Sequence, residues 1–292
     1  MTAIPILEVG GTHVTAAWVH PQEWQVSAAV RRELDGRADS AVLIKEFAAA
    51  AAALDADPGS DWGVAMPGPF DYSAGIAWYV GVGKFDSLHG IDVRRELLAA
   101  MPNRPGSISF INDASAFLVG EWLAGQARGT SRSAAVTLGT GIGSAFLADG
   151  QVIDSGPDVP PDAEAHLLFH EGRPLEELVS RRALRRRFAE LASRSDEPDV
   201  REIADLARSG DATAAKVFDT AFELLGRVLG PWMNRFGAEV IVLGGSISRA
   251  WDLIADPLHR GLSISGDIPV RLTEDAERSA LVGSAYPAYL LR

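Results

Sequence analysis

The same alternating pattern of apolar and polar residues occurs in two stretches of the chain. In residues 4–20 the alternation is interrupted by Gly10 and Gly11, which predicts a strand, a tight turn and a second strand. Residues 134–151 repeat this pattern around a second glycine turn. The repetition predicts two similar α/β lobes, with a substrate site expected in the cleft between them.

Other segments have the pattern of buried strands or of helices. Short apolar runs predict strands at residues 62–66, 107–111 and 240–243. Helix-forming composition or periodicity predicts mainly helical structure at residues 39–54, 114–123, 174–194, 200–236 and 279–291. Strands and helices are therefore expected to be mixed in both lobes.

The composition narrows the classes of protein that fit this pattern. A hydrophobic content of 47% and a charged content of 23% are typical of a globular enzyme, and 292 residues favour two domains. The net charge of −12 argues against a non-specific nucleic-acid binder. The sequence has no cysteine, no apolar run of about 18 residues and no start that fits a signal peptide. We therefore expect a cytoplasmic protein without a nucleic-acid or membrane partner.

The two glycine turns are candidate phosphate-binding loops. Phosphoryl transfer needs backbone donors around the phosphates, a cation site and a base near the acceptor hydroxyl. The sequence contains neither the Walker pattern nor the protein-kinase motifs, and the glycines of residues 139–143 do not form a dinucleotide fingerprint. Taken alone, each turn is equally consistent with an ordinary hairpin.

Taken together, several motifs resemble those of the ROK sugar-kinase family, in the family's order and over almost the whole chain. Glu8-Val9-Gly10-Gly11-Thr12 resembles the phosphate loop D-x-G-G-T, and Asn112-Asp113 resembles the catalytic N-D pair. The other motifs are a sugar-side P-G-P loop at residues 66–69, a second phosphate loop at 138–144, a nucleotide-side V-L-G-G segment at 242–248 and a closing segment at 281–285.

The resemblance implies a two-lobed α/β actin-like ATPase fold, related to ribonuclease H, with a central cleft. Residues 1–113 and 280–292 would form the first lobe, and residues 114–279 the second. The implied activity is that of an ATP-dependent sugar kinase, which phosphorylates a hydroxyl of a hexose or hexose analogue, expected to be the 6-hydroxyl. Asp113 would be the general base, and Asn112 would bind a neighbouring ring hydroxyl. The alternative is that both residues only cap the following helix.

The same resemblance implies a set of ligand contacts. The donor phosphates would lie against Gly10, Gly11, Thr12, Gly139, Thr140 and Gly141. The nucleoside would lie near Gly244 and Gly245, and Mg²⁺ near Glu8. The sugar would contact Gly68, Asn112, Asp113, Glu164, His166 and Glu176. The expected cofactors are ATP and Mg²⁺ without zinc, and the expected assembly is a homodimer.

The sequence departs from the family pattern at several positions. Glu8 replaces the family's aspartate, His13 replaces its usual lysine, and one residue is missing between Glu164 and His166. The family's cysteine-rich zinc module is replaced by residues 167–174. These departures put the register of the sugar-binding element and the identity of the acceptor in question.

Three alternative functions remain open. The chain could be a kinase for an amino sugar or sugar-like cyclitol, a polyphosphate-dependent glucokinase, or a non-catalytic sugar-binding sensor. Residues 140–145 also resemble the loop of zinc-free polyphosphate glucokinases. Finally, His166, His170 and Glu171 could form a metal site if they shared one helix, although no further ligand follows at a known spacing.

Overall fold

The computed structural model describes residues 2–292, which divide into two compact units. Unit 1 comprises the chain up to Arg128 together with Asp275–Arg292, and unit 2 comprises Gly129–Glu274. The family resemblance predicts that the chain leaves the first lobe at residue 113 and returns to it at residue 280. The structure instead keeps residues 114–128 and 275–279 with unit 1.

Unit 1 is built around a five-stranded sheet in the order β3-β2-β1-β4-β7. The central strand β1 pairs with β2 in antiparallel and with β4 in parallel, and β4 pairs in parallel with β7. A small hairpin of β5 and β6 accompanies this sheet. The strands are β1 (Ile4–Val9), β2 (His13–His20), β3 (Gln25–Glu33), β4 (Asp61–Met66), β5 (Phe70–Asp71), β6 (Ile76–Ala77) and β7 (Ser107–Asn112).

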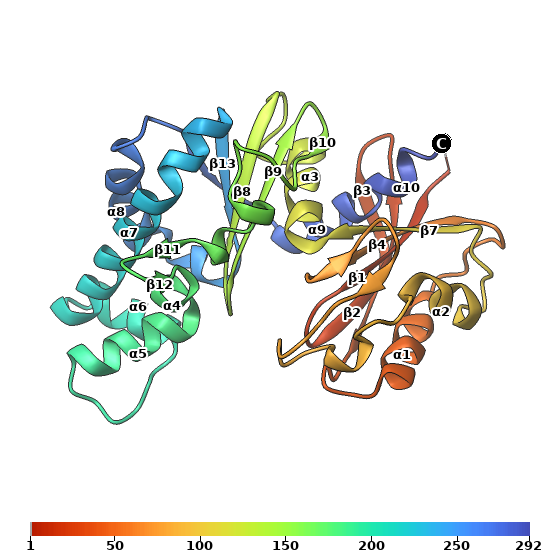
Figure 1. Cartoon of the computed structure of the whole chain (residues 1–292), viewed down its shortest axis with the longest axis horizontal. Coiled ribbons are helices and arrows are strands. Elements are labelled where there is room, and N and C mark those ends of the chain that lie inside the picture. Colours follow the sequence, from red (N-terminus) through yellow and green to blue (C-terminus); the bar gives the residue numbers. More distant parts are fainter. Residues whose placement is uncertain (1) are drawn as a thin grey trace. The chain divides into compact units, whose positions relative to one another are not determined.

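Helices cover both faces of this sheet, because apolar side chains alternate between its faces along β1. Leu7 and Val9 belong to the cluster that α1 and α2 cover, whereas Ile4 and Ile6 belong to the cluster that α9 and α10 cover (Figure 1). The helices are α1 (Ser40–Ala52), the 3-10 helix η1 (Asp86–Leu88), α2 (Val93–Ala100), α3 (Asp113–Ala124), α9 (Ala276–Ser284) and α10 (Tyr286–Tyr289).

A close crossing of α3 and α9 explains why α3 belongs to unit 1. A Cβ at Gly120 would overlap the carbonyl oxygen of Ser279, and a Cβ at Gly283 would overlap that of Ala116. The buried Glu121 links the two helices, because its Oε1 accepts a hydrogen bond of 2.8 Å from Ser279 Oγ. The two backbones can approach this closely only because glycine has no side chain.

Unit 2 contains a second five-stranded sheet, in the order β10-β9-β8-β13-β14. Strand β8 pairs with β9 in antiparallel and with β13 in parallel, and β13 pairs in parallel with β14. The strands of unit 2 are β8 (Arg132–Leu138), β9 (Ile142–Ala148), β10 (Gln151–Val152), β13 (Val240–Gly244), β14 (Val270–Leu272) and the separate hairpin β11 (Phe169–His170) and β12 (Arg173–Pro174).

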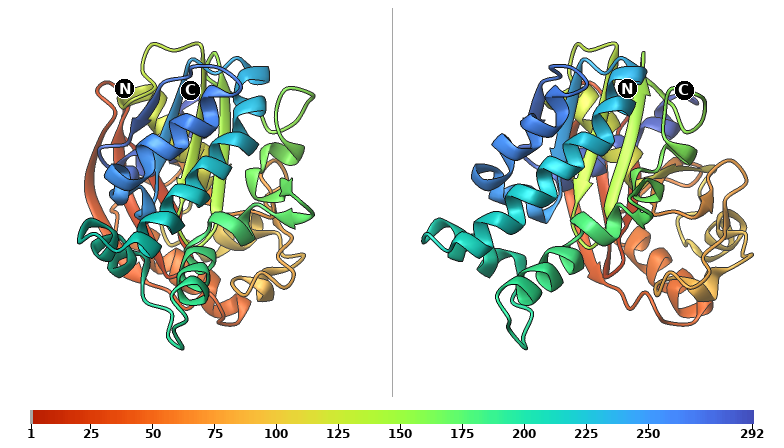
Figure 2. Two further views of the ribbon diagram at one scale, coloured as in Figure 1. Left: turned by 90° about the vertical axis from the view of Figure 1, so that its left-hand side faces the viewer. Right: turned by 60° about the vertical axis from the view of Figure 1, so that its left-hand side comes forward.

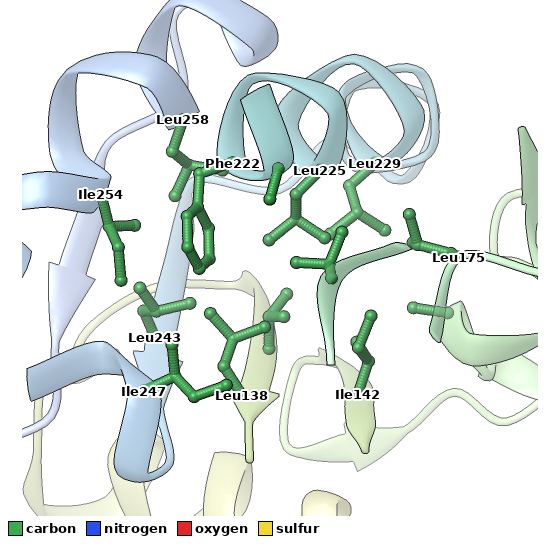
Figure 3. Close-up of a cluster of buried hydrophobic side chains, with 14 of the residues drawn as sticks. Leu138, Ile142, Leu175, Phe222, Leu225, Leu229, Leu243, Ile247, Ile254 and Leu258 are labelled. Carbon is green, nitrogen blue, oxygen red and sulfur yellow. The ribbon is translucent and has the colours of Figure 1, made fainter. Parts of the chain in front are cut away.

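The core of unit 2 lies between this sheet and a helical layer. The long helix α7 and the helix α8 run side by side (Figure 2). Phe222, Leu225 and Leu229 of α7 pack above Leu138 and Ile142 of the sheet (Figure 3). The helices are η2 (Pro161–Ala163), η3 (Ala165–Leu167), α4 (Glu176–Val179), α5 (Arg181–Leu191), α6 (Val200–Arg208), α7 (Ala212–Phe236), η4 (Ser246–Ala250) and α8 (Trp251–Ser263).

The predicted duplication is present in the structure. In both units an antiparallel hairpin with a glycine turn leads into two further parallel strands, so that β1, β2 and β4 correspond to β8, β9 and β13. The predicted strands and helices are all found, although the closing helix begins earlier than expected and is divided into α9 and α10. None of the helices in residues 2–292 combines the length and apolar character that a membrane span requires.

Candidate active site

Three parallel strands of unit 1 bring predicted site residues to one edge of the sheet. Glu8 lies next to Ala65 in the register of β1 and β4, and Met66 lies next to Asn112 in the register of β4 and β7. The carboxyl ends of these strands therefore share one edge, which is where α/β proteins bind their ligands. The turn after β1, the Gly68 loop after β4 and Asp113 after β7 all begin there.

The turn between β1 and β2 presents backbone donors at this edge. The Gly10 N–H closes the turn with a hydrogen bond of 2.9 Å to the carbonyl oxygen of His13. Within residues 2–292, the N–H groups of Gly11 and Thr12 donate no hydrogen bond. Free consecutive N–H groups in a turn are suited to bind an anion such as phosphate. The turn thus fits the predicted role of Gly10, Gly11 and Thr12.

Glu8 offers a carboxylate oxygen that fits a cation. Its Oε2 is buried and accepts no hydrogen bond from the part of the chain that the structure describes. The nearest basic atom is His13 Nε2 at 3.4 Å, which forms an ion pair only when His13 is protonated. A carboxylate oxygen in this state is the type of ligand that Mg²⁺ prefers. Glu8 can therefore hold magnesium, directly or through a water.

Asn112 caps α3 and is also bound to a tyrosine. Its Oδ1 accepts hydrogen bonds from the backbone N–H groups of Ala114 and Ser115, at 2.9 and 3.1 Å. Its Nδ2 donates to Tyr72 Oη at 2.9 Å. Asn112 therefore caps α3. Only its second amide hydrogen is left to bind a sugar hydroxyl.

Asp113 is half-buried in the first turn of α3, where its Oδ1 accepts a 2.9 Å hydrogen bond from the Ala114 N–H. Burial raises the pKa of Asp113, because it disfavours the charged carboxylate. The Lys84 ammonium and the Ala114 hydrogen bond lower this pKa, whereas the Glu8 carboxylate raises it. A carboxylate with a raised pKa at a strand end is suited to accept a proton.

Two tyrosines hold the Gly68 loop. Tyr79 Oη donates to the Pro67 carbonyl oxygen at 2.6 Å, and Tyr72 Oη donates to the Met66 carbonyl oxygen at 3.2 Å. The Gly68–Pro69 peptide bond is cis. Burial raises the pKa of Tyr79, so this hydroxyl stays a proton donor. Through Tyr72, the loop that carries Gly68 is connected to Asn112.

In unit 2, the second glycine turn lies against the glycine pair at the end of β13. Gly139 N–H donates to the Gly141 carbonyl oxygen at 3.0 Å, which forms the turn. Gly244 is paired with Thr137 of β8, and Gly245 has a φ of +88°. A Cβ at Gly245 would overlap the end of β8, so only glycine fits there. The structure therefore brings the predicted phosphate and nucleoside residues of unit 2 together.

Glu176 lies beside the second glycine turn. Its Oε2 accepts a hydrogen bond of 3.3 Å from the Ile142 N–H, and a Cβ at Gly141 would lie 2.5 Å from the same oxygen. Glu176, a predicted sugar-binding residue, is thus in contact with Gly141, a predicted phosphate-binding residue. Since the carboxylate would repel a phosphate at Gly141, the arrangement favours Glu176 as the occupant of that side of the turn.

The sugar-recognition element of unit 2 is organised by Ser144. Its Oγ donates to the Ala163 carbonyl oxygen at 2.6 Å and accepts from the Ala165 N–H at 2.8 Å, so it fixes the backbone on both sides of Glu164. Glu164 Oε2 lies 3.2 Å from His166 Nε2. The shortened spacing between the two residues therefore still places their side chains in contact.

The alternative metal site at His166, His170 and Glu171 has the wrong geometry. His166 lies in η3 and His170 in β11, so the two histidines do not share a helix face. His170 Nε2 lies 3.9 Å from Glu171 Oε1, without a third partner from this set. Among residues 2–292, no three His, Cys, Asp or Glu side chains are grouped so that they could hold a metal ion.

Further functional candidates lie in a loop of unit 1 that local sequence patterns do not predict. Residues 70–86, for which the sequence pattern makes no prediction, bring Tyr72, Tyr79 and Lys84 to this edge of unit 1. The one available signal was that Lys84 is among the few lysines of an arginine-rich chain.

Comparisons with known proteins find matches that extend over most of the chain. The ROK family profile matches residues 6–161 and 170–265. The glucokinase of Thermotoga maritima is 28% identical over 251 residues, which are 76% of this chain and 77% of that protein. The crystal structure of a ROK hexokinase from Thermus thermophilus has a TM-score of 0.81 and 25% identity, over 99% of each chain.

A further solved structure supports the fold alone. It is a ROK family glucokinase from Streptomyces griseus in complex with glucose and AMPPNP, with a TM-score of 0.75 and 19% identity over 99% of this chain and 100% of that one. The expected actin-like ATPase fold is thereby confirmed.

Proposed function

The chain belongs to the ROK family and is a sugar kinase of that family, and we propose that it transfers the terminal phosphoryl group of ATP to the 6-hydroxyl of a hexose or close hexose analogue. One observation carries this proposal most directly. The half-buried Asp113 carboxylate lies at the sheet edge that also carries Glu8 and the Gly10–Thr12 turn.

Asp113 is the general base of the proposed reaction. The acceptor hydroxyl becomes a better nucleophile when a carboxylate at hydrogen-bond distance takes its proton as it attacks phosphorus. The anchoring of Asp113 Oδ1 on the Ala114 N–H fixes the side chain, and this orientation leaves Oδ2 available for the hydroxyl. The raised pKa strengthens the carboxylate as a base.

The two glycine turns bind the phosphates of ATP. Gly10, Gly11 and Thr12 contribute N–H groups in unit 1, and the turn of Gly139, Thr140 and Gly141 in unit 2 contributes on the side that Glu176 does not occupy. In this proposal the nucleoside lies near Gly244 and Gly245, which adjoin the second turn. Mg²⁺, held near Glu8, would neutralise charge on the phosphates when bound.

Sugar recognition in this proposal comes from both units. Gly68 and the remaining amide hydrogen of Asn112 act from unit 1. Glu164, His166 and Glu176 act from unit 2, where carboxylates and an imidazole can each bind ring hydroxyls. We further propose that the enzyme is cytoplasmic, requires no zinc and acts as a homodimer.

A substrate panel tests the proposal. ADP release is measured with ATP and Mg²⁺ over hexoses, amino sugars and cyclitols, and sugar phosphate is measured with polyphosphate as the donor. We expect turnover with ATP and a hexose. If only an amino sugar or a cyclitol is phosphorylated, that compound replaces the hexose as the proposed acceptor. If only polyphosphate supports turnover, it replaces ATP as the proposed donor. If one sugar binds and none turns over with either donor, the chain is a sensor and the proposal is wrong.

A further inference from the structure

A lysine from a distant loop covers the first glycine turn. An ideal Cβ at Gly11 would lie 3.1 Å from Lys84 Cδ and 3.8 Å from Lys84 Nζ. A Cβ at Gly36 would lie 2.8 Å from the Gly11 carbonyl oxygen and 3.2 Å from Lys84 Cβ. Gly11, Gly36 and Lys84 are therefore in mutual contact, and the ammonium lies beside the turn that carries the free N–H groups.

The loop that carries Lys84 is fixed from several directions. Asp86 accepts hydrogen bonds from the N–H groups of Val82 and Gly83, at 3.1 and 3.2 Å. Phe85 N–H donates to the Gly36 carbonyl oxygen at 2.5 Å, and the Phe85 ring is buried. The Lys84 ammonium lies 6.0 Å from the centre of this ring. Lys84 is thus held in position by its neighbours in the chain.

The ammonium of Lys84 has no carboxylate partner at contact distance. No hydrogen bond or ion pair joins it to any other group in residues 2–292, although the side chain is half-buried. It is close enough to Asp113 to act on that carboxylate electrostatically. A partly buried cation that is not paired, beside free N–H groups, is a site for an anion.

We propose that Lys84 is a further catalytic residue, whose ammonium binds the phosphoryl group during its transfer. This inference rests on the proposed kinase activity. The sugar oxygen forms a bond to the terminal phosphorus as its proton passes to Asp113, and the bond to the bridging oxygen breaks with its electron pair leaving on ADP. Lys84 forms no covalent bond and exchanges no proton. It stabilises charge on the phosphoryl oxygens as they move.

The test compares Lys84→Met, which keeps the length of the side chain, with Lys84→Arg and with Lys45→Met. Lys45 is an exposed lysine of α1 and serves as the control. For Lys84→Met we expect kcat to fall about 10²–10³-fold, as when one charge-stabilising donor is removed. Lys84→Arg should restore part of the rate, and Lys45→Met should match the wild type. Sugar dissociation constants and melting temperatures should change little in all three variants.

The pH profile separates a direct role from an indirect one. If Lys84 acts only by lowering the pKa of Asp113, kcat of Lys84→Met will equal that of the wild type at pH values where Asp113 is fully ionised in the variant. That result would overturn the proposal. A kcat within threefold of wild type would overturn it as well. If the wild type phosphorylates no sugar, the proposed function fails, and the affinity for tripolyphosphate tests Lys84 separately. The proposal then expects at least tenfold weaker binding by Lys84→Met, and unchanged binding would contradict it.

Discussion

Asp113 combines two properties that a general base needs. It is anchored by a backbone hydrogen bond, and its burial disfavours the carboxylate form and raises its pKa. The Lys84 ammonium acts in the opposite direction and lowers the pKa of Asp113. Because the base must be ionised, activity is lost as the pH falls through the raised pKa.

We therefore predict that the acid limb of kcat/KM lies above the ordinary aspartate pKa of 3.8. The measurement is a pH profile of kcat/KM, which reports groups of the free enzyme. An acid limb at or below the ordinary value would mean that the titrating base is not a buried Asp113.

Substitution of Asp113 by Asn gives the more direct test of the base. Asp113→Asn keeps the shape of the side chain but cannot accept the proton, so kcat should fall about 10²–10⁴-fold. Sugar affinity should stay within a few-fold, because the amide still forms hydrogen bonds. The control is Asp55→Asn, an exposed aspartate in unit 1. Near wild-type turnover of Asp113→Asn would remove Asp113 from the mechanism.

Substitutions of Glu8 distinguish an active kinase from a protein that has lost its kinase activity. If Glu8 holds magnesium in a working enzyme, Glu8→Gln should lose most of its turnover and need more Mg²⁺, because it removes a buried negative charge. Sugar affinity should be nearly unchanged. A kinase that has lost its function would instead gain rate from Glu8→Asp, which restores the shorter carboxylate of the family motif. Magnesium titrations of kcat in both variants distinguish the two outcomes.

The residues of the site could be predicted where they end a strand. Asn112 and Asp113 follow a short apolar run, and both glycine turns interrupt an alternating pattern, so their positions follow from local sequence. Lys84 and Tyr72 reach the same edge from a loop. Tertiary contacts set the path of this loop, among them the hydrogen bond from the Phe85 N–H to the Gly36 carbonyl oxygen. Nothing in the local pattern indicates those contacts.

At the scale of elements, helix pairs in both units pack through glycines. In unit 2, a Cβ at Gly226 of α7 would lie 2.5 Å from the Leu258 carbonyl oxygen of α8, and a Cβ at Gly261 would overlap the Glu223 carbonyl oxygen. Gly230 of α7 has more room, because a Cβ there would lie 3.1 Å from Ser265 Oγ, which is a side-chain atom. Gly226 and Gly230 of α7 therefore provide a test substitution and its control in the same helix.

We predict that Gly226→Ala destabilises unit 2 and that Gly230→Ala does so much less. Overpacking against a backbone carbonyl costs about 1–3 kcal/mol. The gain in helix propensity from glycine to alanine, about 1 kcal/mol, offsets part of this cost in both variants. Denaturant unfolding followed by circular dichroism gives the difference. Equal midpoints for the two variants would show that the helices can move apart at Gly226.

Several strands and helices could not be predicted because their sequences lack the usual periodic signal. Strand β3 has no buried residue along its length, so it lacks the alternation of a half-buried strand. Helix α8 contains Pro257, a residue that normally argues against a helix interior. Residues 169–174 form the hairpin of β11 and β12, which is too short to have a periodic signal.

At the scale of the whole chain, unit 1 is discontinuous and unit 2 is not. The duplicated hairpins indicated two lobes, but the sequence could not show that α3 remains with unit 1. That assignment depends on the contact of Gly120 with Ser279 and of Gly283 with Ala116, which joins residues far apart in sequence. Local patterns contain no information on such a pairing.

The discontinuity makes a prediction about fragments. Residues 129–274 contain a complete sheet with its own helical core, so this fragment should fold alone. Residues 1–128 lack α9 and α10, and their sheet then exposes the face formed by Ile4, Ile6 and Val19, which Leu281 and Ala285 cover in the full chain. Burial of a large aliphatic side chain contributes about 1.5–3 kcal/mol, so the loss of this cover should prevent a stable fold. Joining residues 275–292 to residue 128 through a flexible linker should restore it. Thermal unfolding of the three proteins gives the comparison, and a cooperative transition of the 1–128 fragment at the temperature of the linked protein would show that α9 and α10 are dispensable for unit 1.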